Sequence, residues 1–226
     1  MINLNSDLGE GAGSDEAILT VIDSANLACG VHAGSPMETI RVAALCRERG
    51  VEVGAHPGYD DRARFGREET GQSVEAIEAL IRFQVGALAA VVPIAYIKAH
   101  GALYHRCQVD PQAAAALARC AKDFGVGVMG QPGFEILAAA KAAGIPAFRE
   151  GFADRAYLPD GRLAPRSQPG AVLDSEAAAA QGLRLAREGE VDSICIHGDS
   201  PGAPAVARAV REALAGSGIE TGPLRR

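Results

Sequence analysis

The sequence predicts an α/β fold built on a parallel sheet of about seven strands. Short apolar segments alternate seven times with longer, alanine-rich amphipathic segments, and no long linker interrupts the alternation. The length of 226 residues fits one large α/β domain. The sheet is expected to be either open, with helices on both faces, or closed as a barrel. No GxGxxG motif follows the first strand, so nothing favours an open dinucleotide-binding sheet.

The expected strands are short apolar segments, each followed by a turn or a loop. In chain order they span residues 2–7, 25–30, 51–56, 95–100, 126–130, 147–150 and 193–197. The expected helices are the longer amphipathic segments at residues 15–23, 36–49, 74–92, 111–123, 133–143, 175–188 and 203–216.

Capping residues support several of these helices. Ser73 and Asp110 are expected N-caps, and Pro111 suits the first position of a helix. Glycines that follow a helical segment are typical of helix ends, and here they are Gly50, Gly125 and Gly144.

One segment, residues 152–173, has proline and glycine turns and little helical periodicity. We expect a long connection with a small hairpin at residues 159–161. Long loops in compact domains are often functional, so this connection is a candidate part of a site.

Composition bears on the partners and the compartment. A net charge of −6 with scattered arginines argues against a nucleic acid or an anionic membrane as partner, since both need a basic face. The five cysteines are widely spaced without a CxxC pair, which favours reduced thiols. No signal peptide is apparent, and the longest nearly apolar segment is only 13 residues. We therefore expect a cytoplasmic protein, and a homo-oligomer is compatible with this composition.

The two-residue period of a strand gives each expected strand one apolar face and one small or polar face. The polar face suits the interior of a narrow barrel that opens to a site. Its members in four strands are Asn3, Asn5 and Asp7; Glu52, Gly54 and His56; Tyr96, Lys98 and His100; and Ser193, Cys195 and His197.

Histidines and an aspartate fall where expected strands end. Asp7, His56, His100 and His197 each close a strand, and His32 follows another. Parallel α/β folds build their sites at this edge of the sheet, so we expect a shared site. Its use is either metal binding or acid–base catalysis. No HxH, HExxH or HxxxH spacing supports a metal, which favours catalysis.

Further polar residues follow the same strand ends: Arg67, Glu150, Asp154, Arg155 and Asp199. Alternative roles remain for some of them. Asp199 or Ser200 could cap the next helix, and the Asp154–Arg155 pair could equally be structural.

Six segments together resemble the LamB/YcsF family, and they follow the family order from residue 3 to residue 203. They read "NLNSDLGEG", "SANLACGVHAGSP", "VGAHPGYDDRARFGR", "YIKAHGALYH", "EGFADRAYLPDGRLAPRSQPGAVL" and "ICIHGDSPGA". Three residues differ from common family residues: Ser6 replaces a cysteine, Ser35 an acidic residue and Ala99 a proline. We interpret these differences as variation within the family.

The resemblance implies a distorted, incomplete (β/α) barrel with about seven parallel strands, similar to glycoside hydrolase/deacetylase barrels, in one domain spanning residues 1–226. Family members are identified as the A subunit of prokaryotic 5-oxoprolinase, which opens the lactam ring of 5-oxoproline (pyroglutamate) to give L-glutamate with ATP. The implied partners are 5-oxoprolinase subunits B and C. This chain has no apparent ATP-binding motif, so B and C are expected to bind ATP and to phosphorylate the lactam carbonyl.

This hypothesis assigns roles to the site residues. Asp7 or Glu10, with His56 or His100, would activate water. Lys98 would stabilise developing negative charge or hold the substrate carboxylate, for which Arg67 and Arg155 are further candidates. The remaining expected substrate-binding residues are His32, Glu150, Asp154, His197 and Asp199.

Two other functions are open. One is a metal-dependent deacetylase or amidohydrolase that acts alone, with Asp7, His56 and His100 as ligands of a divalent metal. The other is a non-catalytic subunit that binds 5-oxoproline and delivers it to its partners.

Overall fold

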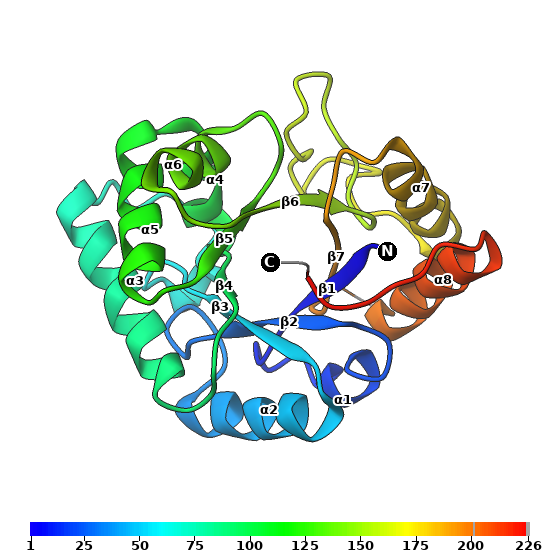
Figure 1. Cartoon of the computed structure of the whole chain (residues 1–226), viewed down its shortest axis with the longest axis horizontal. Helices are drawn as coiled ribbons and strands as arrows, with labels where there is room; N and C mark the ends of the chain where they lie inside the picture. The colour runs from blue at the N-terminus through cyan, green and yellow to red at the C-terminus, as the bar shows by residue number, and fades with distance from the viewer. Residues whose placement is uncertain (201, 225–226) are drawn as a thin grey trace.

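The structure is a computed structural model that describes residues 1–200 and 202–224. In this part of the chain, seven parallel strands close into one barrel in chain order, and the first strand pairs with the last (Figure 1). The strands are β1 (Asn3–Leu8), β2 (Ser24–Ala28), β3 (Glu52–His56), β4 (Tyr96–Ile97), β5 (Gly127–Gly130), β6 (Ala147–Phe152) and β7 (Ser193–His197).

Helices surround the barrel on its outside (Figure 1). They are α1 (Asp15–Ile18), α2 (Pro36–Arg49), α3 (Val74–Ala89), α4 (Gly101–Val109), α5 (Pro111–Asp123), α6 (Glu135–Ala143), α7 (Ser175–Glu188) and α8 (Ala203–Gly216), with a short 3-10 turn, η1, at Arg62–Arg64. None of the helices in the described residues is both long and apolar enough to cross a membrane.

The predicted α/β barrel of seven parallel strands is confirmed. It is incomplete only in the number of strands, since the common (β/α) barrel has eight. The domain extent of residues 1–226 stays a prediction, because Pro201, Arg225 and Arg226 lie outside the described residues.

One predicted helix is much shorter than expected, and one helix was missed. The segment at residues 15–23 forms only one helical turn, Asp15–Ile18. A helix at Gly101–Val109 was not predicted. This helix buries Leu103, Tyr104 and Cys107, which have helical spacing, but the polar residues between them mask the pattern in so short a segment.

Strand β4 is shorter than the expected residues 95–100, yet its alternation continues. The amide of Lys98 donates to the carbonyl of Ala55 at 2.9 Å, and the amide of His100 donates to that of Pro57 at 2.8 Å. Lys98 and His100 therefore stay on the inward side, as the two-residue period predicts.

The predicted caps are largely confirmed. The Ser73 hydroxyl accepts a hydrogen bond from the Ala76 amide, and the Asp110 carboxylate accepts from the amides of Gln112 and Ala113. Three predicted glycines have positive φ at helix ends, namely Gly50, Gly125 and Gly144.

The interior of the barrel is polar and the outside of the strands is apolar. Inside, Asn3 Oδ1 accepts from the hydroxyls of Ser24 and Ser193, and the Asn5 amide donates to the Ser193 hydroxyl. Outside, Leu4 and Ile194 pack in one cluster with apolar residues of α7 and α8. The prediction of one polar and one apolar face is confirmed, and the burial of these apolar side chains stabilises the barrel.

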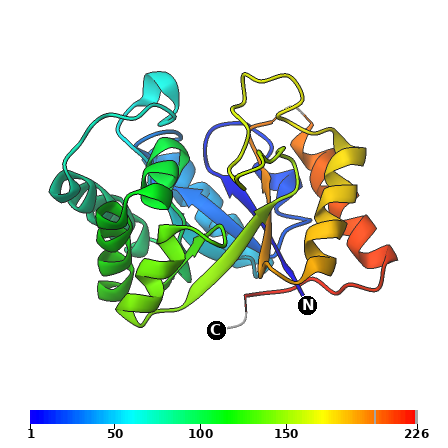
Figure 2. The same ribbon diagram turned by 90° about the horizontal axis from the view of Figure 1, so that it is seen from above.

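The long connection at residues 152–173 lies over the carboxyl end of the barrel. Figure 2 shows it rising at the same end as the segment that follows β3. The predicted hairpin is confirmed by an antiparallel bridge between Tyr157 and Leu163. The buried Arg155 guanidinium donates to the carbonyls of Ala164 and Ala171, which ties the two ends of the loop together.

Candidate active site

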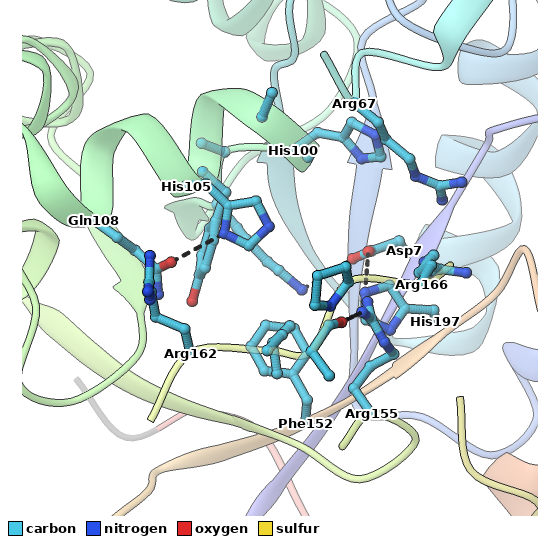
Figure 3. Close-up of a pocket in the computed structure, with 18 of the residues that line it drawn as sticks. Asp7, Arg67, His100, His105, Gln108, Phe152, Arg155, Arg162, Arg166 and His197 are labelled. Atoms are coloured by element: carbon cyan, nitrogen blue, oxygen red, sulfur yellow. Dashed lines mark hydrogen bonds and ion pairs between the residues drawn. The ribbon is translucent and has the colours of Figure 1, made fainter. Parts of the chain in front are cut away.

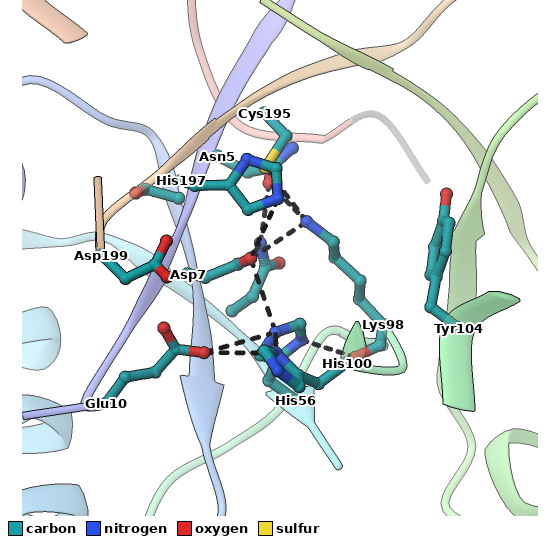
Figure 4. A network of polar contacts seen from close by, with 12 residues as sticks. Asn5, Asp7, Glu10, His56, Lys98, His100, Tyr104, Cys195, His197 and Asp199 are labelled. Atoms are coloured by element: carbon teal, nitrogen blue, oxygen red, sulfur yellow. Dashed lines mark hydrogen bonds and ion pairs between the residues drawn. The ribbon is translucent and has the colours of Figure 1, made fainter. Parts of the chain in front are cut away.

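The barrel brings the predicted ionisable side chains together at the carboxyl ends of its strands. Most of them are buried, and Figure 4 shows several that point toward one another. The buried members are Asp7, Glu10, His32, His56, Lys98, His100, Glu150, Asp154 and Arg155. Ionisable groups this dense and this buried are typical of functional sites.

Lys98 is the central cation of this cluster and is 2% exposed. Its Nζ lies 3.0 Å from Asp7 Oδ1, 2.7 Å from Glu150 Oε1 and 3.1 Å from Cys195 Sγ. Burial alone would lower the pKa of Lys98, but the charges of the neighbouring groups outweigh it and raise that pKa well above the ordinary value. Lys98 is therefore an ammonium ion that carries full positive charge at neutral pH.

Asp7 is held as a carboxylate by the groups around it. Its Oδ1 accepts from Asn26 Nδ2 at 2.8 Å and from Lys98, and its Oδ2 lies 3.5 Å from His56 Nε2. Burial would raise the pKa of Asp7, yet the charges of Lys98, His56 and His197 hold that pKa well below the ordinary value.

Glu150 contrasts with Asp7 although both contact the same ammonium. It is completely buried, and this burial raises the pKa of its carboxyl even though Lys98 opposes the shift. The hydroxyl of Tyr104 donates to Glu150 Oε2 at 3.3 Å. Two carboxyl groups whose pKa values are shifted in opposite directions are suited to be a base and an acid in one site.

A second group of side chains lies beside Asp7. Glu10 Oε1 is 3.4 Å from His32 Nε2, 3.3 Å from His100 Nδ1 and 3.9 Å from His56 Nε2. The rings of His32 and His100 stack with centroids 4.0 Å apart and planes 8° apart. These four residues could hold a metal ion, since one donor atom from each lies within 4.8 Å of the others.

Asp7 belongs to a separate possible donor group with Cys195 and His197. The expected ligands Asp7, His56 and His100 are thus divided between the two groups, and that metal assignment stays a prediction.

His197 is oriented by Asp154. Its Nδ1 lies 3.0 Å from Asp154 Oδ1, and its backbone amide donates to Oδ2 of the same carboxylate at 3.0 Å. Its Nε2 consequently faces Asp7 Oδ2 at 3.9 Å. Burial would raise the pKa of Asp154, but its contact with His197 lowers it. Of the undecided Asp154–Arg155 pair, Asp154 contacts the site and Arg155 fixes the loop above it.

Glycines let the loops approach closely around the histidines. Gly101 has a φ of 54°, and a Cβ there would lie 2.6 Å from the carbonyl oxygen of Gly66. A Cβ on Gly66 would in turn lie 2.9 Å from the His32 side chain. The close contact of these backbones places the carbonyl of Phe65 2.8 Å from His100 Nε2.

A cavity of about 630 Å³ opens above these groups (Figure 3). Asp7, His56, His100 and His197 contribute to its lining. Among the described lining residues, Asp7 is the one acidic side chain, whereas the cations are Arg67, Lys98, Arg155, Arg162 and Arg166. In a chain with a net charge of −6, such a cavity favours an anionic ligand.

Two arginines at the mouth of the cavity share one aspartate. The Arg67 guanidinium donates to Asp199 Oδ2, and Arg166 Nη2 donates to Asp199 Oδ1 at 3.1 Å. The possibility that Asp199 or Ser200 caps α8 was wrong, because Gly202 is the N-cap of that helix.

Several residues of the site were not predicted. Asn5 and Cys195 contact Lys98 and lie on predicted polar faces, so the strand period gave a signal for both. Arg162 and Arg166 lie in the long connection already expected to be functional, but nothing singled them out from other arginines. Tyr104 reaches Glu150 from the unpredicted helix α4.

Acid is expected to destabilise the protein through His32. Burial lowers its pKa to about 4, and the hydrogen bond to Glu10 only partly offsets this. The unfolded chain has a histidine pKa of about 6.5, so it binds the proton more readily than the folded protein does. The stability contributed by the neutral ring is complete above about pH 6.5 and is lost as the pH falls toward about 4.

Urea unfolding near pH 7.5 and near pH 5, with a chelator present, measures this contribution. His32→Asn should lose less unfolding free energy on acidification than the unmodified chain, by roughly 2 kcal/mol. Equal losses for His32→Asn and the unmodified chain would contradict this account.

Comparison with known proteins gives close relatives over the whole chain. The sequence pattern of the LamB/YcsF family matches residues 2–226. The chain is 43% identical over 239 residues to a protein of Neisseria meningitidis serogroup A that is named as the A subunit of 5-oxoprolinase, with 97% of this chain and 98% of the relative covered. A protein of Thermus thermophilus with the same name is 42% identical over 244 residues, again with 97% and 98% covered.

Solved structures agree with these sequence matches. The crystal structure of a lactam utilization protein from Thermus thermophilus has a TM-score of 0.90 and 41% sequence identity, with 98% of each chain covered. A family 4 carbohydrate esterase from Streptomyces lividans has a TM-score of 0.57 at 12% identity, covering 98% of this chain and 91% of the esterase. The second likeness shows a shared fold alone.

Proposed function

The chain belongs to the LamB/YcsF family, and from this premise we propose that it is the ring-opening subunit of an ATP-dependent 5-oxoprolinase. In this proposal it converts 5-oxoproline to L-glutamate together with subunits B and C. The names of its relatives, which are the A subunit of 5-oxoprolinase and a lactam utilization protein, support this role.

The observation that carries the proposal is the cavity that joins a cationic mouth to Lys98 and Asp7, with Glu150 behind Lys98. The carboxylate of 5-oxoproline is an anion that such a mouth can bind. The lactam is a stable amide, so its opening needs an activated carbonyl, a positioned base and an acid for the leaving nitrogen. The side chains of the site include candidates for the base and for the acid.

The geometry supports one division of roles. Asp7 is a carboxylate next to the cavity and accepts a proton from the attacking water, with His56 or His197 beside it. Lys98 stabilises negative charge on the phosphorylated lactam oxygen as water adds to the carbon. Lys98 lines the cavity and passes a proton to the ring nitrogen as the carbon–nitrogen bond breaks, and Glu150, whose pKa is raised, replaces that proton from behind.

ATP enters the proposal through the partner subunits. Subunits B and C would transfer the γ-phosphoryl group of ATP to the lactam oxygen and release ADP, which turns a poor electrophile into a good one. Attack of water and cleavage of the carbon–nitrogen bond then give an acyl phosphate, and a second water hydrolyses it to L-glutamate and inorganic phosphate. The guanidinium groups of Arg162 and Arg166 at the cavity mouth then suit a substrate that arrives with additional negative charge.

The rim arginines are expected to act in binding rather than in chemistry. Arg166→Met should raise the KM for 5-oxoproline about tenfold and leave kcat within about twofold, because a charge-assisted hydrogen bond contributes roughly 1.5 kcal/mol. Steady-state kinetics of the assembled complex measures both constants. Arg184→Met is the control, since Arg184 is paired with Glu188 on the outside of α7. A lower kcat with an unchanged KM would assign Arg166 to the chemical step instead.

The proposed function is tested by adding this chain to its candidate partner subunits with 5-oxoproline and ATP. Formation of L-glutamate only when the chain is present supports it. Titration of the isolated chain with 5-oxoproline separates catalysis from delivery. A chain that binds 5-oxoproline while its Lys98 and Asp7 variants keep full ring-opening activity would be a delivery subunit.

A further inference from the structure

Three metal-donor atoms converge beside the cavity: Glu10 Oε1, His56 Nε2 and His100 Nδ1. His100 Nδ1 lies 3.0 Å from His56 Nε2 and 3.3 Å from Glu10 Oε1, while His56 Nε2 lies 3.9 Å from that oxygen. The side chains are buried, and His56 and His100 line the cavity. Figure 4 shows the carboxylate of Glu10 directed at the two rings.

The hydrogen bonds of the two rings fix where their protons lie. His56 Nδ1 contacts the carbonyl oxygen of Lys98 at 2.8 Å, and His100 Nε2 contacts the carbonyl oxygen of Phe65 at 2.8 Å. A carbonyl oxygen only accepts, so both of these nitrogens carry hydrogen. In neutral rings the two facing nitrogens, His56 Nε2 and His100 Nδ1, then both present lone pairs to each other at 3.0 Å.

Two lone pairs at this distance repel each other unless a cation lies between them. One additional proton could join His56 to His100, and Glu10 Oε1 would then keep only its contact with His32. A metal ion engages all three donors. Ligands about 2.0–2.1 Å from a tetrahedral zinc ion are about 3.3 Å apart, and the three separations here are 3.0, 3.3 and 3.9 Å. Each ring also donates its outer N–H to a carbonyl oxygen, as metal-bound histidines commonly do.

His32 has a different role, although it is close to the same carboxylate. Its ring stacks on that of His100 with centroids 4.0 Å and planes 8° apart, so the in-plane lone pairs of these two rings lie in separate, nearly parallel planes. Parallel lone pairs do not meet at one ion. His32 Nε2 instead lies 3.4 Å from Glu10 Oε1, where it can orient the carboxylate.

We propose that Glu10, His56 and His100 bind one divalent transition-metal ion of the zinc class. The His₂Glu donor set is one that catalytic zinc sites use, with a further coordination position left for water or substrate. That position would face the cavity, because His56 and His100 line it. The carboxylate is Glu10 and not the expected Asp7, because Glu10 Oε1 lies near the facing nitrogens of both rings, whereas among the described residues Asp7 Oδ2 contacts His56 and His197 but not His100. When bound, such an ion acts as a Lewis acid and lowers the pKa of a coordinated water.

Zinc binding to the isolated chain tests the proposal without any partner subunit or substrate, so it is independent of the proposed function. The chain is treated with EDTA, dialysed and titrated with ZnCl₂ by calorimetry, and bound zinc is counted by mass spectrometry. We expect one zinc ion per chain at a site with nitrogen and oxygen donors in X-ray absorption. Failure to bind zinc at micromolar concentration would overturn the proposal and leave a shared proton between the two rings.

Substitutions distinguish the proposed metal ligands from residues that only lie near them. Glu10→Gln, His56→Gln and His100→Gln should each weaken zinc binding by roughly 100-fold or more, and His32→Gln by about tenfold through the orientation of Glu10. His105→Gln is the matched control and should bind zinc like the unmodified chain, because His105 contacts Gln108 and lies outside the donor group. Unchanged binding by His56→Gln and His100→Gln would overturn the proposal.

The X-ray absorption spectrum is recorded on the unmodified chain. This test therefore remains valid even if a substitution prevents a variant from folding. A sulfur donor in that spectrum would place the ion at Asp7, Cys195 and His197 instead, and would also overturn the proposal.

Discussion

The ring-opening turnover of a complex assembled with Lys98→Met is expected to fall by about a thousandfold, the size of effect seen when a group that stabilises transition-state charge is removed. Lys98 is the one ammonium within contact distance of both Asp7 and Glu150 in the described residues. Methionine keeps most of the length of the side chain and removes its charge. The expected result is a lower kcat, with a smaller change in KM, in an assay of L-glutamate formation.

The same substitution should lower the stability of the chain, and this effect has to be measured separately. Loss of one partner from a buried ion pair costs about 3–5 kcal/mol, which urea unfolding detects. Lys122→Met is the matched control, since Lys122 is exposed on α5 and donates to the Ala143 carbonyl at 3.1 Å. A folded Lys98→Met chain with turnover within about threefold of the unmodified chain would remove Lys98 from the chemical step.

Asp7→Asn is expected to give the second large loss, of about 10²–10⁴-fold in kcat, which is the usual contribution of a general base. The amide fills the same volume but cannot accept a proton at neutral pH. The pKa of Asp7 is held well below its ordinary value, with the charges of Lys98, His56 and His197 opposing the effect of burial. Asp7 should therefore stay ionised at mildly acidic pH, and its protonation should not limit the turnover of the unmodified complex there.

A matched substitution at the other end of the barrel controls for charge and structure. Asp192 pairs with Arg149 beside the start of β7, away from the cavity lining. Asp192→Asn removes the same charge and should leave kcat within about twofold. Equal losses from Asp7→Asn and Asp192→Asn would mean that the effect of Asp7 is structural.

The sequence was sufficient to predict the barrel and much of its site, for a physical reason. Parallel strands all end at the same edge, so residues that close several strands must meet there. Asp7, His56 and His197 come from β1, β3 and β7, and the structure brings both histidines within contact distance of Asp7. The inward position of Lys98 followed in the same way from the two-residue period of its strand.

The pairing within the site could not be predicted, because it depends on the register between strands and on loops. Lys98 contacts Glu150 of β6 because its long side chain extends across the barrel. The sequence around either residue does not predict this contact. The ion pairs of Asp199 with Arg67 and Arg166 join three segments far apart in the chain. Helix α4, which carries Tyr104, is too short and too polar between its buried residues for its periodicity to identify it.

The different pKa shifts of Asp7 and Glu150 also come only from tertiary structure. Both carboxyl groups contact Lys98, and the residues next to them in the sequence do not indicate which carboxyl group has the higher pKa. Glu150 is completely enclosed and its pKa rises, whereas Asp7 has additional cationic neighbours and its pKa falls. The proposed division into base and acid rests on this asymmetry.

The most direct test of the central claim is the amount of L-glutamate formed per ATP hydrolysed in a complex of this chain with its candidate subunits B and C. With the unmodified chain, we expect glutamate formation that requires both 5-oxoproline and ATP, in a constant ratio to ATP hydrolysis. With Asp7→Asn in its place, glutamate formation should be lost even if ATP hydrolysis continues. Equal glutamate formation with the unmodified chain, with Asp7→Asn and with no chain at all would contradict the claim that this subunit opens the ring.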